Sequence, residues 1–286
     1  MWDEIVEQIS AATGVAFCLG DARPVGGGCI NEAYRLDGNG GPFFAKLNRA
    51  DELEMFEAEV DGLRDIAATE TIRVPHPVCH GISGGQAYLV LEHIELGGGG
   101  SQSELGRCLA KLHAVLQPNF GWRRDNTIGS TPQPNPSGDD WVAFLREHRL
   151  GFQCRLAKRN ALRLDGADDL LGQLDGFFAG YEPRPSLLHG DLWNGNIAFG
   201  PCGEPVIFDP ATYCGDREAE FGLTEMFGGF GNDFWSAYEA EWPLDPGYPT
   251  RKLLYQLYHT LNHYNIFGGG YGSAAEGIVS RLLRAL

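Results

Sequence analysis

The sequence lacks several features that mark common classes of protein. Over 286 residues, no stretch reaches the roughly 18 consecutive apolar residues that a membrane-spanning helix needs. The seven cysteines are scattered and include no C-x-x-C pair, so neither a disulfide framework nor a zinc knuckle is expected. The N-terminal segment MWDEIVEQIS is acidic and amphipathic, unlike a signal peptide. We therefore expect a cytoplasmic protein.

Positive charge is also scarce. The chain has 22 lysines and arginines against 38 acidic residues, which gives a formal net charge of −16. Such a surface repels nucleic acid backbones and anionic lipid headgroups. We expect neither nucleic acid nor a membrane among the partners. Net charge does not exclude a nucleotide, because backbone amides and Mg²⁺ can neutralise phosphates locally.

Two familiar nucleotide-binding motifs are missing. The glycine cluster Gly26-Gly27-Gly28 is part of neither G-x-x-x-x-G-K-[ST] nor G-x-G-x-x-G, so neither a P-loop ATPase nor a Rossmann domain is supported. Glycines nevertheless allow backbone N–H groups to approach phosphates closely. The cluster therefore remains a candidate phosphate-binding loop.

Apolar residues recur with a strand-like pattern in the first third of the chain and with helical spacing in the remainder. A run of four glycines at 97–100 separates the two parts. The expected elements are helices over 2–12 and 51–68, the second with Asp51 as N-cap, a hairpin within 23–48, a buried strand over 86–94, and later helices around 105–115 and over 141–159, 251–263 and 274–286.

The segment LHGDLWNGN, followed by VIFDP, carries the clearest chemical signal. Asp191 is followed five positions later by Asn196, and Asp209 ends an apolar run thirteen residues beyond Asn196. Protein kinases place in this order a carboxylate that accepts the substrate hydroxyl proton and two oxygen ligands for Mg²⁺. Each residue alone is also typical of turns, but their joint order predicts a phosphoryl-transfer site.

Upstream residues occur in the same kinase-like order. The strand after the glycine cluster carries Lys46, one of only four lysines, in the position of the lysine that contacts the α- and β-phosphates. The next helix carries Glu59 on its apolar side, where it could pair with Lys46, and Glu57 is the competing partner. Beyond it, the strand YLVLEHI is typical of a kinase hinge, in which the carbonyl of Glu92 and the amide of Ile94 would contact adenine.

These patterns together predict an α+β, protein-kinase-like fold with two lobes. We expect a β-rich N-lobe over residues 1–96, with the glycine loop and the helix that carries Glu59. A mainly helical C-lobe over 97–286 would hold the catalytic loop, the metal site and the substrate pocket.

The sequence also resembles the fructosamine kinase (ketosamine 3-kinase) family over nearly its whole length. The resemblance lies in GGCIN, F-x-A-K-x-N around Lys46, MFEAE, DWVAF, HGDLWNGN, GDREAE, TEMFGGF, LYHTLNHYN and FGGGY. It implies transfer of the ATP γ-phosphate to the C3 hydroxyl of a sugar–amine adduct, which frees the amine after the phosphate decomposes. It also implies that Asp191 is the base, that Asn196 and Asp209 bind Mg²⁺, and that Lys46 and Glu59 organise the phosphates.

Some further residues are assigned less directly. Trp193 is a candidate for the sugar pocket, with core packing as the alternative. Asp216, Arg217 and Glu218 would contact substrate or brace the metal loop, and Glu220 stands where the resemblance leads us to expect a shorter aspartate. Cys29, in the glycine loop, is either a redox-active thiol or a small residue in a tight turn. The pair His259 and His263 is expected to be structural rather than metal-binding.

Two rival functions remain open. A choline or aminoglycoside kinase would share the fold and use another hydroxyl acceptor. A nucleotide-binding pseudoenzyme is disfavoured because each expected catalytic residue type is present. The preferred sugar and amine, small-molecule versus protein-bound adducts, and monomer versus homodimer are also left open.

Overall fold

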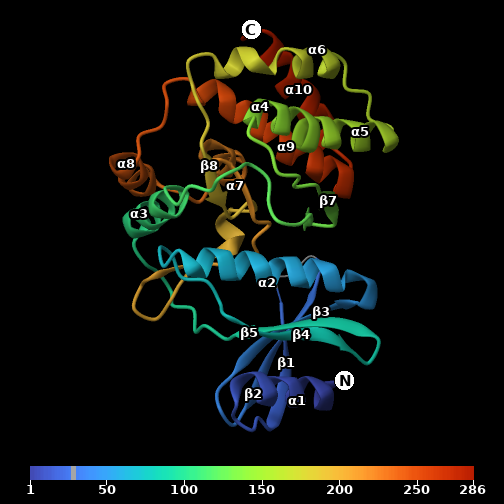
Figure 1. Ribbon diagram of the computed structural model, residues 1–286, viewed down its shortest axis with the longest axis vertical. Coiled ribbons are helices and arrows are strands. Elements are labelled where there is room, and N and C mark those ends of the chain that lie inside the picture. Colours follow the sequence, from blue (N-terminus) through green and yellow to red (C-terminus); the bar gives the residue numbers. More distant parts are fainter. Residues whose placement is uncertain (27–29) are drawn as a thin grey trace.

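A computed structural model describes residues 1–26 and 30–286. The chain has a sheet-rich N-terminal part and a helical C-terminal part, and its termini lie at opposite ends of the molecule (Figure 1). Within the described residues, five antiparallel strands form one sheet in the order β1-β2-β3-β5-β4. The elements of this part are α1 (Trp2–Thr13), β1 (Leu19–Val25), β2 (Glu32–Gly38), β3 (Phe43–Arg49), α2 (Leu53–Ala68), β4 (Pro77–Ser83) and β5 (Gln86–Glu92).

Strand β5 explains why the predicted run over 86–94 is continuously apolar. Leu89 and Leu91 belong to the core that includes α2, whereas Tyr88 and Val90 belong to the core beneath α1. Both faces of the strand are therefore covered, so its side chains need not alternate between apolar and polar. Helix α2 lies between the sheet and the helical part, as Figure 1 shows, which places Glu59 close to both.

The predicted N-cap of α2 is wrong. The chain first forms a 3₁₀ turn over Ala50–Glu52, and α2 begins at Leu53 without a side-chain cap. The carboxylate of Asp51 instead accepts a hydrogen bond from the Arg49 guanidinium at 2.9 Å. A nearby arginine thus takes the acceptor that a helix start would otherwise use.

The C-terminal part is built mainly of helices around short strand pairs. Its elements are α3 (Gln102–His113), β6 (Asn126–Ile128), β7 (Thr131–Gln133), α4 (Trp141–Phe144), α5 (Gly151–Arg159), α6 (Ala167–Gly172), β8 (Pro185–Leu188), β9 (Ile197–Phe199), β10 (Pro205–Ile207), β11 (Tyr213–Asp216), α7 (Glu220–Phe227), α8 (Asn232–Glu241), α9 (Tyr248–Phe267) and α10 (Tyr271–Leu283).

The helix predicted over 141–159 is continuous but not uniform. A π-helical stretch, Leu145–Leu150, joins α4 to α5. At Gly151, which follows this wider turn, a Cβ atom would lie 2.3 Å from the carbonyl oxygen of Arg146. The close backbone approach requires glycine here, a local detail that hydrophobic periodicity does not reveal.

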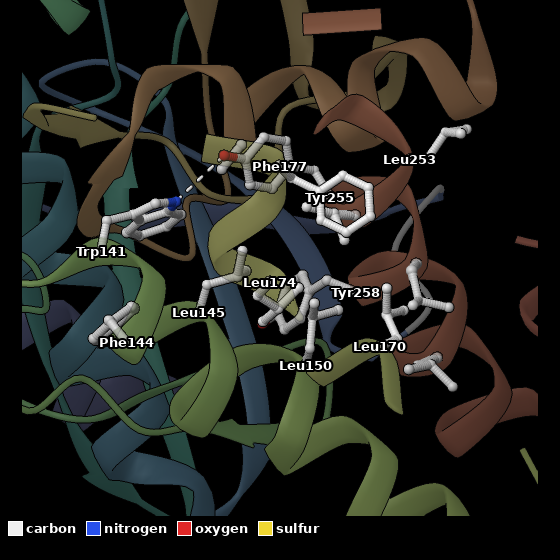
Figure 2. Close-up of a cluster of buried hydrophobic side chains, with 14 of the residues drawn as sticks. Trp141, Phe144, Leu145, Leu150, Leu170, Leu174, Phe177, Leu253, Tyr255 and Tyr258 are labelled. Carbon is white, nitrogen blue, oxygen red and sulfur yellow. Dashed lines mark hydrogen bonds between the residues drawn. The ribbon is translucent and has the colours of Figure 1, made fainter. Parts of the chain in front are cut away.

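Two cores support the helical part. Side chains from α4, the π-helical stretch and α9 interleave in the core shown in Figure 2, where Trp141 donates a hydrogen bond to the Tyr255 hydroxyl at 3.3 Å. A second core spans both parts of the chain, with Phe56 and Leu89 from the first and Phe221 from the second. Because the parts share this core, the lobe boundary at residues 96 and 97 remains a proposal. In the part of the chain that the structure describes, no helix has the length and apolar character needed to cross a membrane.

Candidate active site

Strand β8 ends immediately before the predicted catalytic loop. Gly190 has φ +83°, and a Cβ atom there would lie 2.2 Å from the carbonyl oxygen of Ala211. The loop is drawn toward the segment around Asp209 by two hydrogen bonds, one from the Ala211 amide to the His189 carbonyl at 2.9 Å and one between His189 Nε2 and the Phe208 carbonyl at 3.0 Å. Glycine permits this close approach, which brings two distant segments together.

Asp191 and Asn196 are in direct contact. The amide nitrogen of Asn196 donates to the backbone carbonyl of Asp191 at 2.8 Å and to its Oδ2 at 3.0 Å. The Asp191 carboxyl is enclosed by protein, although the residue keeps some solvent exposure. Burial raises its pKa to about 8, despite the opposing hydrogen bond from Asn196, and the carboxylates of Asp209 and Glu220 add to the rise. A carboxyl group tuned toward neutral pH can exchange a proton with a substrate hydroxyl.

Lys46 joins the two parts of the site. Its Nζ lies 2.6 Å from Glu59 Oε1 on α2 and 2.6 Å from Asp209 Oδ1. Burial opposes the lysine charge, but the two carboxylates outweigh it and raise the pKa of Lys46. The competing residue Glu57 pairs with Arg124 instead, at 3.1 Å. Lys46 thus stays charged where the sheet meets the segment that follows β10.

Asp209 differs from its two partners in being accessible. Its side chain is 46% exposed, whereas those of Lys46 and Glu59 are 5% and 9% exposed. Its φ of 60° is in the left-handed region, which an aspartate adopts more readily than most residues. This backbone conformation carries a carboxylate that is open on one side and bonded to Lys46 on the other.

The chemistry of Asn196 and Asp209 fits a Mg²⁺ site that is completed by a nucleotide. Both side chains offer hard oxygen ligands, which Mg²⁺ prefers. Among the described residues, Asn196 Oδ1 accepts no hydrogen bond, because its amide nitrogen faces Asp191. The same residues contain no group of three or more His, Cys, Asp or Glu side chains that could hold a metal. Phosphate oxygens would therefore have to supply further ligands.

The structure describes only some of the residues that we predicted to contact the nucleotide. Gly26 is exposed at the end of β1, whereas Gly27, Gly28 and Cys29 lie outside the described residues. Strand β5 ends at Glu92, two residues before Ile94. The Glu92 carboxylate binds Arg73 at 2.8 Å. The adenine contacts of Glu92 and Ile94 therefore remain predictions.

Trp193 is 38% exposed, which contradicts the core-packing alternative. Its ring centroid lies 5.6 Å from that of Phe227, which is 43% exposed. The series continues from Phe227 to His263 at 5.3 Å and from His263 to Tyr271 at 5.1 Å. A row of rings, exposed at Trp193 and Phe227, therefore starts two residues after Asp191 in the chain.

Asp216, Arg217 and Glu218 are turned away from solvent, which favours the bracing role over substrate contact, the two roles that the sequence left open. Asp216 accepts hydrogen bonds from the hydroxyls of Tyr181 and Tyr255 at 2.8 and 2.6 Å. Arg217 donates to the carbonyl of Trp242 at 2.7 Å, and Glu218 binds Arg251 at 2.7 Å. All three residues are at most 4% exposed. They form part of the scaffold beneath the site.

Glu220 contacts the catalytic loop directly, which sequence reasoning left in doubt. Its carboxylate accepts hydrogen bonds from the backbone amides of His189 and Gly190, at 2.7 and 2.9 Å. The sequence analysis did not predict a second contact with this loop, in which the Thr224 hydroxyl donates to the Leu192 carbonyl at 2.9 Å. Both residues lie on α7, four positions apart, so they face the same side of that helix. That spacing was the available signal for Thr224.

Of the two histidines of α9, His263 bonds within its own helix, whereas His259 Nδ1 has no hydrogen-bond partner among the described residues. Nδ1 of His263 lies 2.8 Å from the carbonyl oxygen of His259, one turn earlier. His259 is only 4% exposed, and burial lowers its pKa to about 3. This geometry agrees with a structural role for both residues.

Comparisons with known proteins point to one family. A model of the fructosamine kinase family matches residues 1–285. A protein from Synechocystis, named as a probable ketoamine kinase, is 49% identical over 99% of this chain and 97% of its own length. A solved structure assigned as a fructosamine-3-kinase, from Haemophilus somnus, has a TM-score of 0.92 at 29% identity and covers 99% of this chain and 98% of its own.

A more distant structure confirms the fold class. The choline kinase LicA from Streptococcus pneumoniae has a TM-score of 0.67 at 13% identity, covering 100% of this chain and 99% of its own. At that identity the likeness concerns the fold alone, which is the predicted α+β, protein-kinase-like architecture with a sheet-rich lobe and a helical lobe. From the family model and the 49% identical relative together, we conclude that this chain belongs to the fructosamine kinase family.

Proposed function

We propose that the protein transfers the γ-phosphate of Mg-ATP to the C3 hydroxyl of a ketosamine. The observation that carries the proposal is the pairing of Lys46 with both Glu59 and Asp209, each at 2.6 Å, beside a contacting Asp191–Asn196 pair. Membership in a kinase family implies ATP as the donor. The ketosamine acceptor follows the names of the family and of the Synechocystis relative.

Each of the site residues would have a separate role in phosphoryl transfer. Lys46, held by Glu59, would bind the α- and β-phosphates, and Asn196 and Asp209 would hold Mg²⁺, which neutralises charge on the phosphates. Asp191 would accept the hydroxyl proton as the sugar oxygen forms its bond to the γ-phosphorus. The bond from that phosphorus to the bridging β–γ oxygen breaks, and ADP leaves with the electron pair.

The row of rings that begins at Trp193 would receive the acceptor. Trp193 offers an exposed aromatic face two positions after the proposed base in the chain, and such faces pack against sugar C–H groups. Phe227 continues this apolar surface away from Asp191. We propose that the sugar lies against Trp193 and that the amine portion extends toward Phe227, with either a small amine or a protein lysine as the carrier.

A substrate panel tests this function. Mg-ATP turnover should be measured in parallel with a fructosamine, a ribulosamine, choline and an aminoglycoside. We expect turnover with at least one ketosamine, and Asp191→Asn should lower kcat by about 10²- to 10⁴-fold. Asp165→Asn, at a carboxylate that is 82% exposed, is the matched control and should leave kcat unchanged. Preference for choline or the aminoglycoside would overturn the acceptor, and unchanged turnover in Asp191→Asn would overturn the mechanism.

A further inference from the structure

A histidine outside the active site is connected to the catalytic loop. His113, the last residue of α3, has no solvent exposure and packs edge-on against Phe221 and Tyr238. Its Nδ1 lies 2.9 Å from the Tyr238 hydroxyl, and its Nε2 lies 3.5 Å from Glu220 Oε2. Neither contact follows from the proposed chemistry, because α3 supplies no residue to the site described above.

Of these two contacts, only the one with Tyr238 is a hydrogen bond; Nε2 is buried without a hydrogen-bond partner among the described residues and faces the Glu220 carboxylate. Arg217 Nη1 donates to the Tyr238 hydroxyl oxygen at 3.2 Å, and a guanidinium cannot accept. The hydroxyl hydrogen of Tyr238 is then free to point to His113 Nδ1. The opposite tautomer would turn the lone pair of Nε2 toward the Glu220 carboxylate, so we assign the proton of the neutral imidazole to Nε2.

The pKa shifts of His113 and Glu220 agree with this assignment. Burial lowers the pKa of His113, which favours the neutral ring. Burial alone would raise the pKa of Glu220, but contacts with His113 and His189 outweigh it and leave the pKa below its usual value. A carboxylate ionised in this way accepts the backbone amides of His189 and Gly190, the two residues before Asp191.

We propose that His113 is a positioning residue for phosphoryl transfer, the central link of a buried relay Arg217–Tyr238–His113–Glu220 that orients the backbone leading to Asp191. The inference rests on the proposed role of Asp191. It also gives Arg217 a function at a distance: its guanidinium, fixed by the carbonyls of Trp242 and Pro243, donates to the Tyr238 hydroxyl and leaves the hydrogen of that hydroxyl for His113.

Two amide substitutions test the roles of the two ring nitrogens of His113 one at a time. Glutamine places its amide nitrogen near the position of histidine Nε2, whereas asparagine places its amide near Nδ1. His113→Gln therefore keeps a donor to Glu220, and His113→Asn keeps only the contact with Tyr238. Phe234→Leu is the control for packing, because Phe234 is fully buried in the same core and has no polar group.

Steady-state kinetics with Mg-ATP and a ketosamine give the first readout. His113→Asn should lower kcat by about tenfold to a hundredfold, with the KM for ATP within about twofold, because a displaced base affects the chemical step rather than nucleotide binding. His113→Gln should recover most of that loss. Phe234→Leu should lower the melting temperature without lowering kcat. Equal losses of kcat in the Gln and Asn variants would overturn the proposal.

Amide hydrogen exchange of the segment Leu187–Leu192 gives a second readout that needs no substrate. Exchange should accelerate in His113→Asn and stay close to the unsubstituted protein in His113→Gln, since only the first loses the donor to Glu220. Identical exchange in both variants would contradict the relay. If the unsubstituted protein phosphorylates no ketosamine, the proposed function fails, but the exchange comparison still decides the relay.

Discussion

Two clusters of opposite charges, each centred on one cation, differ in how they meet solvent. Lys46 binds Glu59 and Asp209, and the Asp209 side chain is 46% exposed. Arg251 binds Glu218 and Asp245, and the Arg251 and Glu218 side chains are 3% and 0% exposed. The first cluster keeps a carboxylate available to a ligand. In the second, the arginine and the glutamate that it binds through two nitrogens are both closed off, so that pair can serve only the fold. Accessibility, rather than residue type, separates site from scaffold here.

Breaking the closed cluster should give the largest effect on stability. Arg251→Met would leave the Glu218 carboxylate buried without its partner, and we expect the free energy of unfolding to fall by about 3–5 kcal/mol. Urea denaturation followed by circular dichroism measures the change. Arg163→Met is the matched control, because the Arg163 and Asp165 side chains are 90% and 82% exposed, and it should be nearly silent. Equal stability of the two variants would contradict the comparison.

Breaking the open cluster should affect activity instead. Asp209→Asn removes a charge that can be solvated, and Lys46 keeps its contact with Glu59. We expect kcat to fall by about 10²- to 10³-fold, with a change in unfolding free energy well below that of Arg251→Met. Kinetics and urea denaturation on the same preparation test both parts. A large loss of stability with kcat preserved would reverse the assignment of the two clusters.

Acidic pH should lower the free energy of unfolding, because the His259 side chain is buried. The pKa of buried His259 is about 3, below the value of about 6.5 expected for an unfolded histidine. Its contribution to stability is therefore complete above about pH 6.5 and is lost as the pH falls toward 3, by up to about 1.4 kcal/mol per pH unit. Unfolding measured at pH 7 and pH 5.5 should show this loss, and His259→Gln should reduce it. Exposed His80 supplies the matched substitution, because His80→Gln should leave the free energy of unfolding at pH 7 nearly unchanged.

The outer face of α2 should give the smallest effect. Arg124 binds Glu57 and Asp61 at 3.1 and 3.2 Å, and its side chain is 29% exposed. Arg124→Met should cost at most about 1 kcal/mol, because partly exposed ion pairs are screened by water. Stability measured at low and high salt should differ less in this variant than in the unsubstituted protein. A salt dependence that the substitution does not change would show that these pairs do not help to hold α2 in place.

Sequence reasoning succeeded where a motif is local or where pairing follows from helical periodicity. The contact of Asp191 with Asn196 lies within one loop, and the choice of Glu59 over Glu57 followed from its position on the apolar side of α2. It left substrate contact and bracing both open for Asp216, Arg217 and Glu218, because three charged residues at the end of a strand look the same whether they face a cleft or a core. It also missed Thr224 and His113, whose partners are 32 and 107 positions away in the chain.

By itself, the sequence determined the family, the order of the kinase-like residues and most of the helices and strands, because these depend on short-range pattern and on residue identity. Only the tertiary structure decided which charges are open and which are enclosed. Solvent access depends on chain segments that are far apart in the sequence, as when Lys46 meets Asp209 and when Glu220 reaches back to His189. Desolvation then sets the pKa of each group, and so decides which carboxyl can take part in chemistry.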